Sequence, residues 1–195
     1  MSGNNFFNEI ADRWDEINHY PVKKIETMLH MLGIGRSDTV LDVGTGTGVL
    51  LPLLMKQTRP ENITAIDAAE KMIAKAKEKF SNTAIQFIAG DVLEYPLNAD
   101  YYDHIICYSV FPHFEDKRAV IKLFAALLKQ GGLVSILHSS SRENINKTHT
   151  HIASRGISSD YLLPAQEYIP LLNRNGLKEE RVIDNEEMFV LCGRK

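Results

Sequence analysis

Val40-Leu41-Asp42-Val43-Gly44-Thr45-Gly46-Thr47-Gly48 is the stretch that decides the fold of this chain. Its apolar start predicts a short buried strand over 39–44, and its alternating glycines predict a tight turn that leads into a helix over 47–57. Glycine lets the backbone turn sharply and lets a ligand approach with no side chain in the way. A ligand site is therefore expected where this strand ends.

Strand and helix patterns alternate along the chain after this stretch. Further strands are predicted over 63–67, 85–91, 103–110 and 131–138, and helices over 69–80 and 117–128. Such alternation is typical of a doubly wound α/β fold, in which helices cover both faces of a mostly parallel sheet. The last two predicted strands, 176–184 and 187–195, are too close for a helical crossover, so this pair must be antiparallel.

Four more helices are predicted outside this alternation. Two precede the first strand, over 4–18 and 21–32, and two lie within residues 139–175, over 141–155 and 164–174. The second pair opens with a polar run that follows the fifth strand. Doubly wound sheets bind their ligands at the carboxyl ends of their strands, so this polar insert is expected beside the ligand.

Composition narrows the class of protein. The chain has 195 residues, which suits one domain, and a net charge of −3, which argues against a nucleic-acid partner. The lysines between 71 and 79 recur at helical spacing among acidic and apolar residues, which predicts a solvated helix face. The chain shows neither a signal-peptide pattern nor an apolar run near the ~20 residues that span a bilayer. A cytoplasmic protein without a membrane partner is expected.

Three carboxylates lie at or near the ends of the first three predicted strands. Asp42 stands just before Gly44, Asp67 follows 23 residues after Gly44, and Asp91 lies in Gly90-Asp91-Val92. An acid about 20 residues beyond a glycine loop is placed to hold ribose hydroxyls, and Asp91 could accept a hydrogen bond from an adenine amine. Each aspartate alone fits a turn or a cap, but all three at successive strand ends favour a ligand site.

The glycine spacing distinguishes between ligands. A dinucleotide fingerprint requires a glycine where Val49 stands, and Asp42 at the loop would repel a pyrophosphate. The same carboxylate attracts an ammonium group, as in an amino-acid ligand such as methionine. A nucleotide-dependent oxidoreductase is therefore disfavoured.

Together these motifs resemble those of the class I S-adenosylmethionine-dependent methyltransferases. The resemblance rests on 42–48, Asp67, 90–92 and the turn 128–132, and it covers roughly residues 1–138 and the terminal strand pair. Residues 7–15, Phe-Asn-Glu-Ile-Ala-Asp-Arg-Trp-Asp, are similar to the start of the ubiquinone and menaquinone C-methyltransferase type, in which an N-terminal helix folds over the cofactor.

The resemblance implies a fold and a function. The fold would be one three-layer Rossmann-like domain, 1–195, with strand order 3-2-1-4-5-7-6 and the seventh strand antiparallel. Residues 1–32 would form lid helices, and 139–175 a helical insert on the substrate side. The function would be direct transfer of a methyl group from S-adenosylmethionine to a small molecule. A catalytically silent binding protein on the same fold is the alternative, and a homodimer is compatible with either.

The resemblance also implies which residues bind the cofactor. The glycine loop would lie at the methionine part, Asp67 at the ribose, Asp91 and Val92 at the adenine, and the end of the fourth strand at the methionine side. The cofactor-binding residues expected are Asp42, Gly44, Thr45, Gly46, Gly48, Asp67, Ala68, Asp91, Val92, Cys107, Tyr108 and Trp14.

Histidines supply the catalytic candidates. His113 follows the fourth strand and His138 ends the fifth, and a helix over 138–149 would align His138, Arg142, Asn146 and His149 in one polar stripe. Such a stripe could bind an anionic substrate or accept a proton, so we expect catalytic roles for His138, His113, Arg142 and His149. His138, His149 and His151 could alternatively hold a metal, but their spacing matches no known site and none is assigned. A solvated helix face is the third interpretation.

Overall fold

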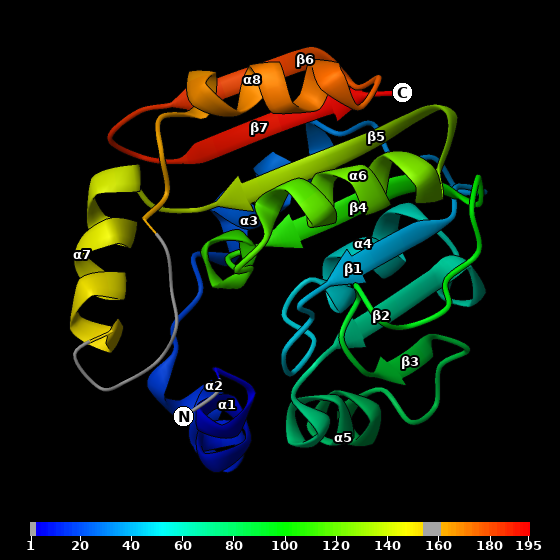
Figure 1. The fold of residues 1–195 in the computed structure, drawn as a ribbon. Coiled ribbons are helices and arrows are strands. Elements are labelled where there is room, and N and C mark those ends of the chain that lie inside the picture. The colour runs from blue at the N-terminus through cyan, green and yellow to red at the C-terminus, as the bar shows by residue number, and fades with distance from the viewer. Residues whose placement is uncertain (1–2, 154–160) are drawn as a thin grey trace.

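The computed structural model describes residues 3–153 and 161–195, and one seven-stranded sheet organises them (Figure 1). The strand order is β3-β2-β1-β4-β5-β7-β6, and β7 alone runs antiparallel to its neighbours, which confirms the predicted topology. The strands are β1 (Val40–Val43), β2 (Ile63–Asp67), β3 (Gln86–Ala89), β4 (Tyr102–Tyr108), β5 (Leu128–His138), β6 (Lys178–Asp184) and β7 (Phe189–Arg194).

Helices lie on both faces of the sheet. α3 and α4 pack on one face and α6 and α8 on the other. α5 lies beside β2 and β3, and α1 and α2 lie next to α5 near the ends of β1 and β2 (Figure 1). The helices are α1 (Gly3–Ile10), η1 (Ala11–Arg13), α2 (Trp14–Ile17), α3 (Val22–His30), α4 (Leu51–Gln57), η2 (Pro60–Asn62), α5 (Glu70–Lys79), η3 (Phe111–His113), α6 (Lys117–Leu127), α7 (Arg142–Ala153) and α8 (Ala165–Arg174).

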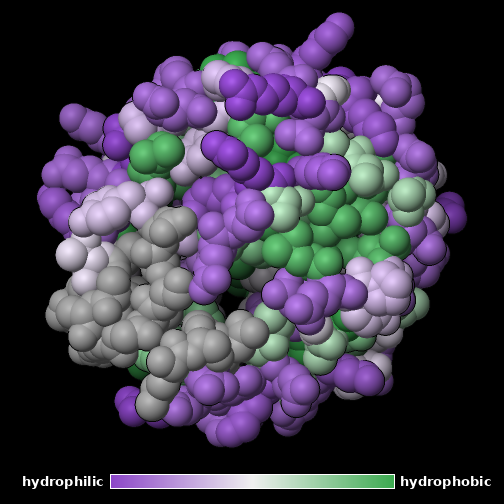
Figure 2. Space-filling model, in the orientation of Figure 1, coloured by the Kyte–Doolittle hydropathy of each residue, from purple (hydrophilic) through white to green (hydrophobic). Residues whose placement is uncertain are grey.

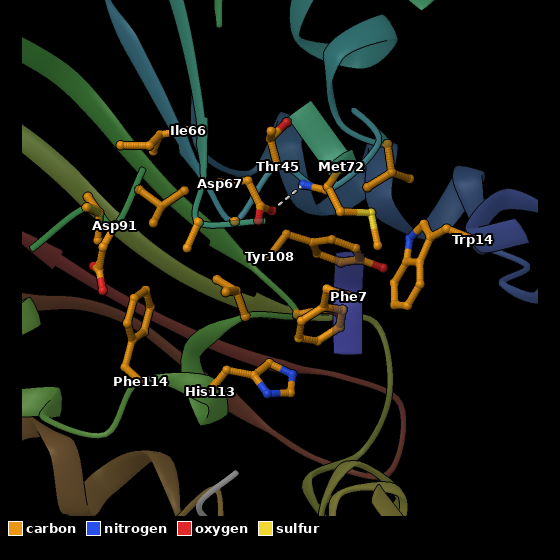
Figure 3. Close-up of a pocket in the computed structure, with 18 of the residues that line it drawn as sticks. Phe7, Trp14, Thr45, Ile66, Asp67, Met72, Asp91, Tyr108, His113 and Phe114 are labelled. Atoms are coloured by element: carbon orange, nitrogen blue, oxygen red, sulfur yellow. Dashed lines mark hydrogen bonds between the residues drawn. The ribbon is translucent and has the colours of Figure 1, made fainter. Parts of the chain in front are cut away.

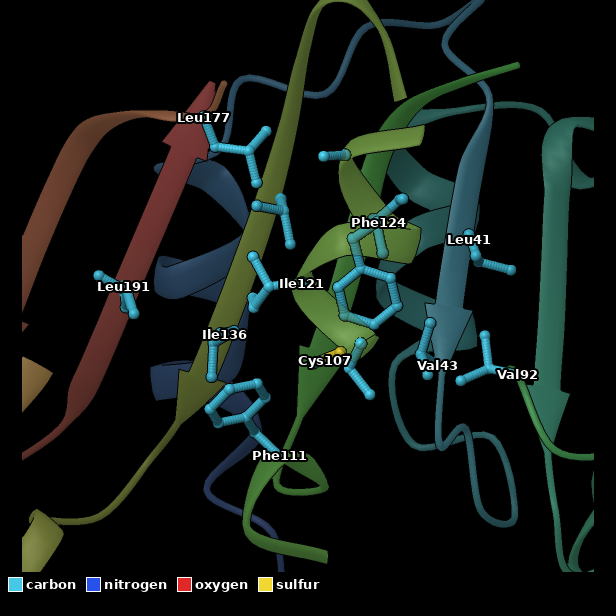
Figure 4. Packing of buried hydrophobic residues seen from close by; sticks show 14 of the residues in the cluster. Leu41, Val43, Val92, Cys107, Phe111, Ile121, Phe124, Ile136, Leu177 and Leu191 are labelled. Carbon is cyan, nitrogen blue, oxygen red and sulfur yellow. The ribbon is translucent and has the colours of Figure 1, made fainter. Parts of the chain in front are cut away.

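The core fills the space between the sheet and these helices. Phe111 and Phe124 are fully buried on the α6 face and pack against Leu41 and Cys107 from the central strands (Figure 4). The central strands are buried on both faces, which is why their sequences are apolar runs instead of alternating patterns. Truncating a buried phenylalanine to alanine typically costs about 3–5 kcal/mol, so this cluster contributes strongly to the stability of the fold.

Two predicted boundaries differ from the structure by three residues or more, and both lie at glycines. The helix expected to begin at residue 47 begins at Leu51, because successive turns close from Gly48 to the Thr45 carbonyl and from Leu51 to the Gly48 carbonyl. The fifth strand was expected to start in the glycine turn at 131, but β5 starts at Leu128, which pairs with Tyr102. The pairing register shifts between Tyr102 and His104, so Gly131 and Gly132 lie in a bulge inside β5.

The N-terminal helices separate into two groups. Ile25, Met28 and Leu29 of α3 are buried against the sheet, so only the segment before α3 lies over the strand ends. That segment packs on α5, with Ala11 buried against Met72. The lysines of α5 lie on an exposed or half-buried face, as predicted, and two of them, Lys75 and Lys79, pair there with acids of the N-terminal segment.

The connection between β3 and β4 crosses the α6 face of the sheet without forming a helix in the described structure. Leu93, Tyr95 and Tyr101 of this connection are exposed, and Figure 2 shows hydrophobic residues gathered beside α6 on this face. Among the described residues, none of the helices is both long and apolar enough to cross a membrane.

Candidate functional site

The glycine loop after β1 depends on three left-handed backbone positions. Gly44, Gly46 and Gly48 have φ values of +69°, +56° and +90°, which residues with a side chain rarely adopt. A Cβ on Gly44 would lie 2.4 Å from Val110 Cγ2, so this glycine also allows the close approach of the β4 loop. Above Gly46 the nearest atom to such a Cβ would be Trp14 Nε1 at 4.0 Å, so this part of the loop faces open space.

Two carboxylates hold the two threonines of the loop. Thr45 donates from its hydroxyl to Asp42 Oδ2 at 2.7 Å, and Thr47 donates to Asp15 Oδ1 at 2.6 Å. Asp42 is 1% exposed, and burial raises the pKa of its carboxyl to about 7, although the Thr45 hydrogen bond acts in the opposite direction. The loop is therefore fixed from below by β1 and from above by α2.

One cavity opens over this loop at the carboxyl ends of β1, β2 and β4 (Figure 3). Doubly wound sheets bind ligands at this edge. The residues around the cavity come from the N-terminal segment, the glycine loop, the ends of β2 and β3, α5 and the segment after β4. They are Phe7, Trp14, Tyr20, Val43, Gly44, Thr45, Gly46, Val49, Ile66, Asp67, Ala68, Met72, Gly90, Asp91, Val92, Tyr108, Ser109, Val110, His113 and Phe114.

Asp67 is the carboxylate at the centre of one end of the cavity. Its Oδ2 accepts from the Gly46 amide and its Oδ1 from the Ala69 amide, both at 2.8 Å, so the side chain cannot swing away from the loop. Burial raises the pKa of this carboxyl, and the two amides only partly offset that effect. Asp91 lies further along the same end, where its Oδ1 caps the amide of Leu93 at 2.9 Å.

Aromatic rings line the cavity from Trp14, which lies above Gly46 of the glycine loop, to the other end. The Phe7 ring meets the Trp14 ring edge to face at 5.7 Å between centroids and the His113 ring at 5.2 Å. Trp14 Nε1 donates to the Tyr20 hydroxyl at 2.8 Å, which satisfies the indole N–H inside the molecule. Burial raises the pKa of Tyr20 to about 12, so this hydroxyl stays protonated at neutral pH.

The segment after β4 brings His113 to this end. Ser109 has a left-handed backbone with φ of +57°, which is strained for a residue with a side chain, and its amide donates to the Leu137 carbonyl at 2.9 Å. This turn directs the chain into η3, where His113 and Phe114 border the cavity. Tyr108, the last residue of β4, is held by a 2.7 Å hydrogen bond to the Ser139 hydroxyl.

Most of the expected cofactor-binding residues surround the cavity, but three do not. Cys107 is fully buried in the hydrophobic core on the α6 face, because its side chain points to the opposite face from Tyr108. A Cβ on Gly48 would meet Phe80 at 2.7 Å, so Gly48 serves packing against the end of α5. Asp42 lies behind the loop and acts on the cavity through Thr45.

Three members of the expected polar stripe, His138, Arg142 and Asn146, are not among the residues that line the cavity. His138 is 3% exposed and packs edge to face on Phe189 at 6.0 Å, on the same face as the α6 core. Arg142 binds Asp184 Oδ2 at 2.9 Å, and the Asn146 side-chain amide bonds to both backbone groups of Leu162. Both side chains therefore fasten α7 to the segments around it.

The remaining histidines of the insert lie partly outside the description. The side chains of residues 149 and 151 are outside the described residues, so the expected catalytic role of His149 stays a prediction. Within the part of the chain that the structure does describe, no group of three His, Cys, Asp or Glu side chains is close enough to hold a metal ion.

Several residues around the cavity were not predicted from the sequence. Met72 and Phe114 lie in apolar patterns that fit a core equally well, so periodicity could not distinguish them. Ser109 carried no pattern of its own. The one available signal was position, because residues directly after a parallel strand lie at the ligand-binding edge.

In a comparison with protein families, residues 40–132 match a methyltransferase domain. These residues run from β1 into β5 and include the glycine loop, Asp67, Asp91 and His113. The matched segment therefore contains most of the residues that line the cavity, whereas the N-terminal segment and α7 lie outside it.

Known relatives agree with this match. An uncharacterized methyltransferase of Bacillus subtilis, YdaC, is 26% identical over 147 residues, which are 75% of this chain and 81% of the relative. A malonyl-[acyl-carrier protein] O-methyltransferase of Acetivibrio thermocellus is 32% identical over 131 residues, which are 66% of this chain but only 46% of that enzyme. A solved structure, an S-adenosylmethionine-dependent methyltransferase of Aquifex aeolicus, shares the fold, with a TM-score of 0.74, 20% identity and coverage of 94% and 97% of the two chains.

Proposed function

Since the chain belongs to the class I S-adenosylmethionine-dependent methyltransferases, we propose that it transfers a methyl group to a small acceptor bound at the aromatic end of its cavity. The observation that carries this proposal is the continuity of the cavity. A single space joins the glycine loop and Asp67 at one end to Phe7, Tyr108 and His113 at the other. A donor and an acceptor can therefore lie end to end inside it.

The donor end fits an adenosyl group joined to an amino acid. Asp67 is held by the Gly46 and Ala69 amides and keeps further lone pairs for ribose hydroxyls. Asp91 and the Val92 backbone lie where an adenine edge would fall, and Thr45 lies at the amino-acid side above buried Asp42. When bound, S-adenosylmethionine supplies an activated methyl group, so the protein needs to add alignment and exclusion of water.

The acceptor end determines what can be methylated. Its rings offer apolar faces, and its walls carry the polar atoms of Tyr20, Tyr108 and His113. No described lysine or arginine lines the cavity, so the site favours an uncharged, largely apolar acceptor over an anionic one. The His113 imidazole is placed to orient the acceptor or to take up its proton as the methyl group arrives.

Binding and turnover test this proposal separately. Calorimetric titration with S-adenosylmethionine, S-adenosylhomocysteine and NAD should show binding of the first two and none of the third. Incubation of the enzyme with methyl-labelled donor and a panel of uncharged aromatic acceptors and matched carboxylates should label the uncharged members. Donor binding without any transfer would favour a catalytically silent binding protein, and binding of NAD alone would overturn the proposal.

A further inference from the structure

The N-terminal segment is aligned on α5 by contacts that repeat along both helices. The Lys71 amide, at the start of α5, donates to Asn8 Oδ1 at 2.9 Å, which caps one of the free amides of that helix. One turn later Lys75 Nζ pairs with Asp12 Oδ1 at 2.8 Å. Figure 1 shows the two segments side by side. Later residues of the N-terminal segment meet later residues of α5, so the two segments run in the same direction.

The last of these contacts involves a third element. Asp15 pairs with Lys79 through one carboxylate oxygen and accepts from the Thr47 hydroxyl through the other, at 2.6 Å. Lys79 Nζ in turn donates to the Thr47 carbonyl at 3.1 Å, which closes a ring of three residues. Burial raises the pKa of the Asp15 carboxyl, but the bonds from Lys79 and Thr47 outweigh it, so the pKa is lowered and the carboxylate stays charged.

This ring of contacts lies next to the donor end of the cavity. Thr47 is 3% exposed and directly follows Gly46, the loop residue that faces open space. Asp15 directly follows Trp14, whose indole lies above Gly46. Trp14 and Gly46 enclose the donor end, and the hydrogen bond between Asp15 and Thr47 joins the residues that directly follow them. Within the described residues Asp12 has no such link to the glycine loop, because its carboxylate is 75% exposed and pairs with Lys75 of α5.

We propose that Asp15 is a positioning residue for the donor, which holds Trp14 over Gly46 through its hydrogen bond with Thr47. Asp12, on the same segment, contributes only a surface ion pair. The inference rests on the proposed function, because it assigns Gly46 and Trp14 to the donor end. It does not require that the acceptor or His113 be correctly assigned.

Asp15→Ala and Asp12→Ala form a matched pair, because each removes one acid that pairs with a lysine of α5. Asp15→Ala should weaken S-adenosylhomocysteine binding about tenfold in calorimetry, whereas Asp12→Ala should change it by less than about twofold. Thr47→Val should reproduce the Asp15→Ala loss and Thr47→Ser should retain wild-type affinity. Acrylamide should quench Trp14 more strongly in Asp15→Ala than in Asp12→Ala. Unfolding midpoints in urea show that the compared variants are folded, and Thr47→Val carries the test if Asp15→Ala is not.

Two results overturn this inference alone: equal weakening by the two alanine variants, or wild-type affinity in Thr47→Val, while the wild-type protein binds S-adenosylhomocysteine. Absence of binding by the wild-type protein overturns the proposed function and this inference with it. The two failures are therefore distinguishable in one set of titrations.

Discussion

Asp42 accepts a 2.7 Å hydrogen bond from the Thr45 hydroxyl, so a buried carboxylate at the end of β1 lies directly beneath the loop that faces the cavity. No cation of the described residues pairs with Asp42. A cationic ligand above Thr45 would offset this buried charge, which links the stability of the loop to ligand binding.

Asp42→Asn should therefore stabilise the free protein at high pH. The folded-state pKa of Asp42 is raised to about 7, so the folded state keeps a proton that the unfolded state has lost, and stability falls as pH rises from about 4 to about 7. The variant should lose this pH dependence. In urea unfolding at pH 8 its free energy of unfolding should exceed that of wild type by about 2–4 kcal/mol, with a smaller difference at pH 5. A variant less stable than wild type at pH 8 would contradict a raised pKa for Asp42 in the folded state.

Asp67→Ala should weaken donor binding strongly. The substitution removes a charge-assisted acceptor, worth about 1.5–3 kcal/mol, at the end of the cavity assigned to the ribose. Asp67→Asn is the control, because it keeps an acceptor for the Gly46 or Ala69 amide while it removes the charge, and it should fall between wild type and alanine. Calorimetry with S-adenosylhomocysteine measures the effect. Unchanged affinity in Asp67→Ala would exclude Asp67 as the ribose ligand.

Donor binding should change the environment of Trp14, the single tryptophan of the chain. Its indole borders the cavity and is held by the Tyr20 hydroxyl, so a ligand over Gly46 would contact it and exclude water from its face. Addition of S-adenosylhomocysteine should shift Trp14 emission and slow amide exchange in residues 3–17. NAD serves as the control ligand. An unchanged spectrum and unchanged exchange at saturating ligand would refute closure by this segment.

His113→Phe should separate chemistry from packing. Phenylalanine keeps a ring against Phe7 but cannot accept a proton, so kcat should fall by roughly 10²-fold while donor affinity stays near that of wild type. The exposed His30, on α3, provides a control in His30→Gln. If His113→Phe retains full turnover, the imidazole has no part in the reaction.

Arg142→Ala should act mainly on stability. Asp184 Oδ2 accepts from both Arg142 and the Ala165 amide, so this carboxylate joins the starts of α7 and α8. Loss of the guanidinium should lower the free energy of unfolding by about 1–2 kcal/mol. Lys147→Ala, which breaks an exposed pair with Glu143 on the same helix, should cost less than about 0.5 kcal/mol. Equal costs in urea unfolding would show that the Asp184 contact adds nothing.

The sequence by itself determined the sheet and the glycine loop. Apolar runs separated by helical patterns predict a parallel sheet, and the glycines of 44–48 predict the turn, because both signals come from local backbone preferences and from burial. The sequence also predicted that Asp67 and Asp91 lie near each other, because the carboxyl ends of parallel strands meet at one edge of the sheet. The order of the strands came from family resemblance.

Only the tertiary structure decided which side chains face the cavity. Cys107 and Tyr108 are neighbours in β4, yet one enters the core and the other lines the cavity. The sequence spacing that aligned His138 with Arg142 assumed one continuous helix, whereas β5 ends at His138 and α7 begins at Arg142. The bond between Asp15 and Thr47 joins positions 32 residues apart. Such contacts depend on how separate elements pack, and no local pattern encodes them.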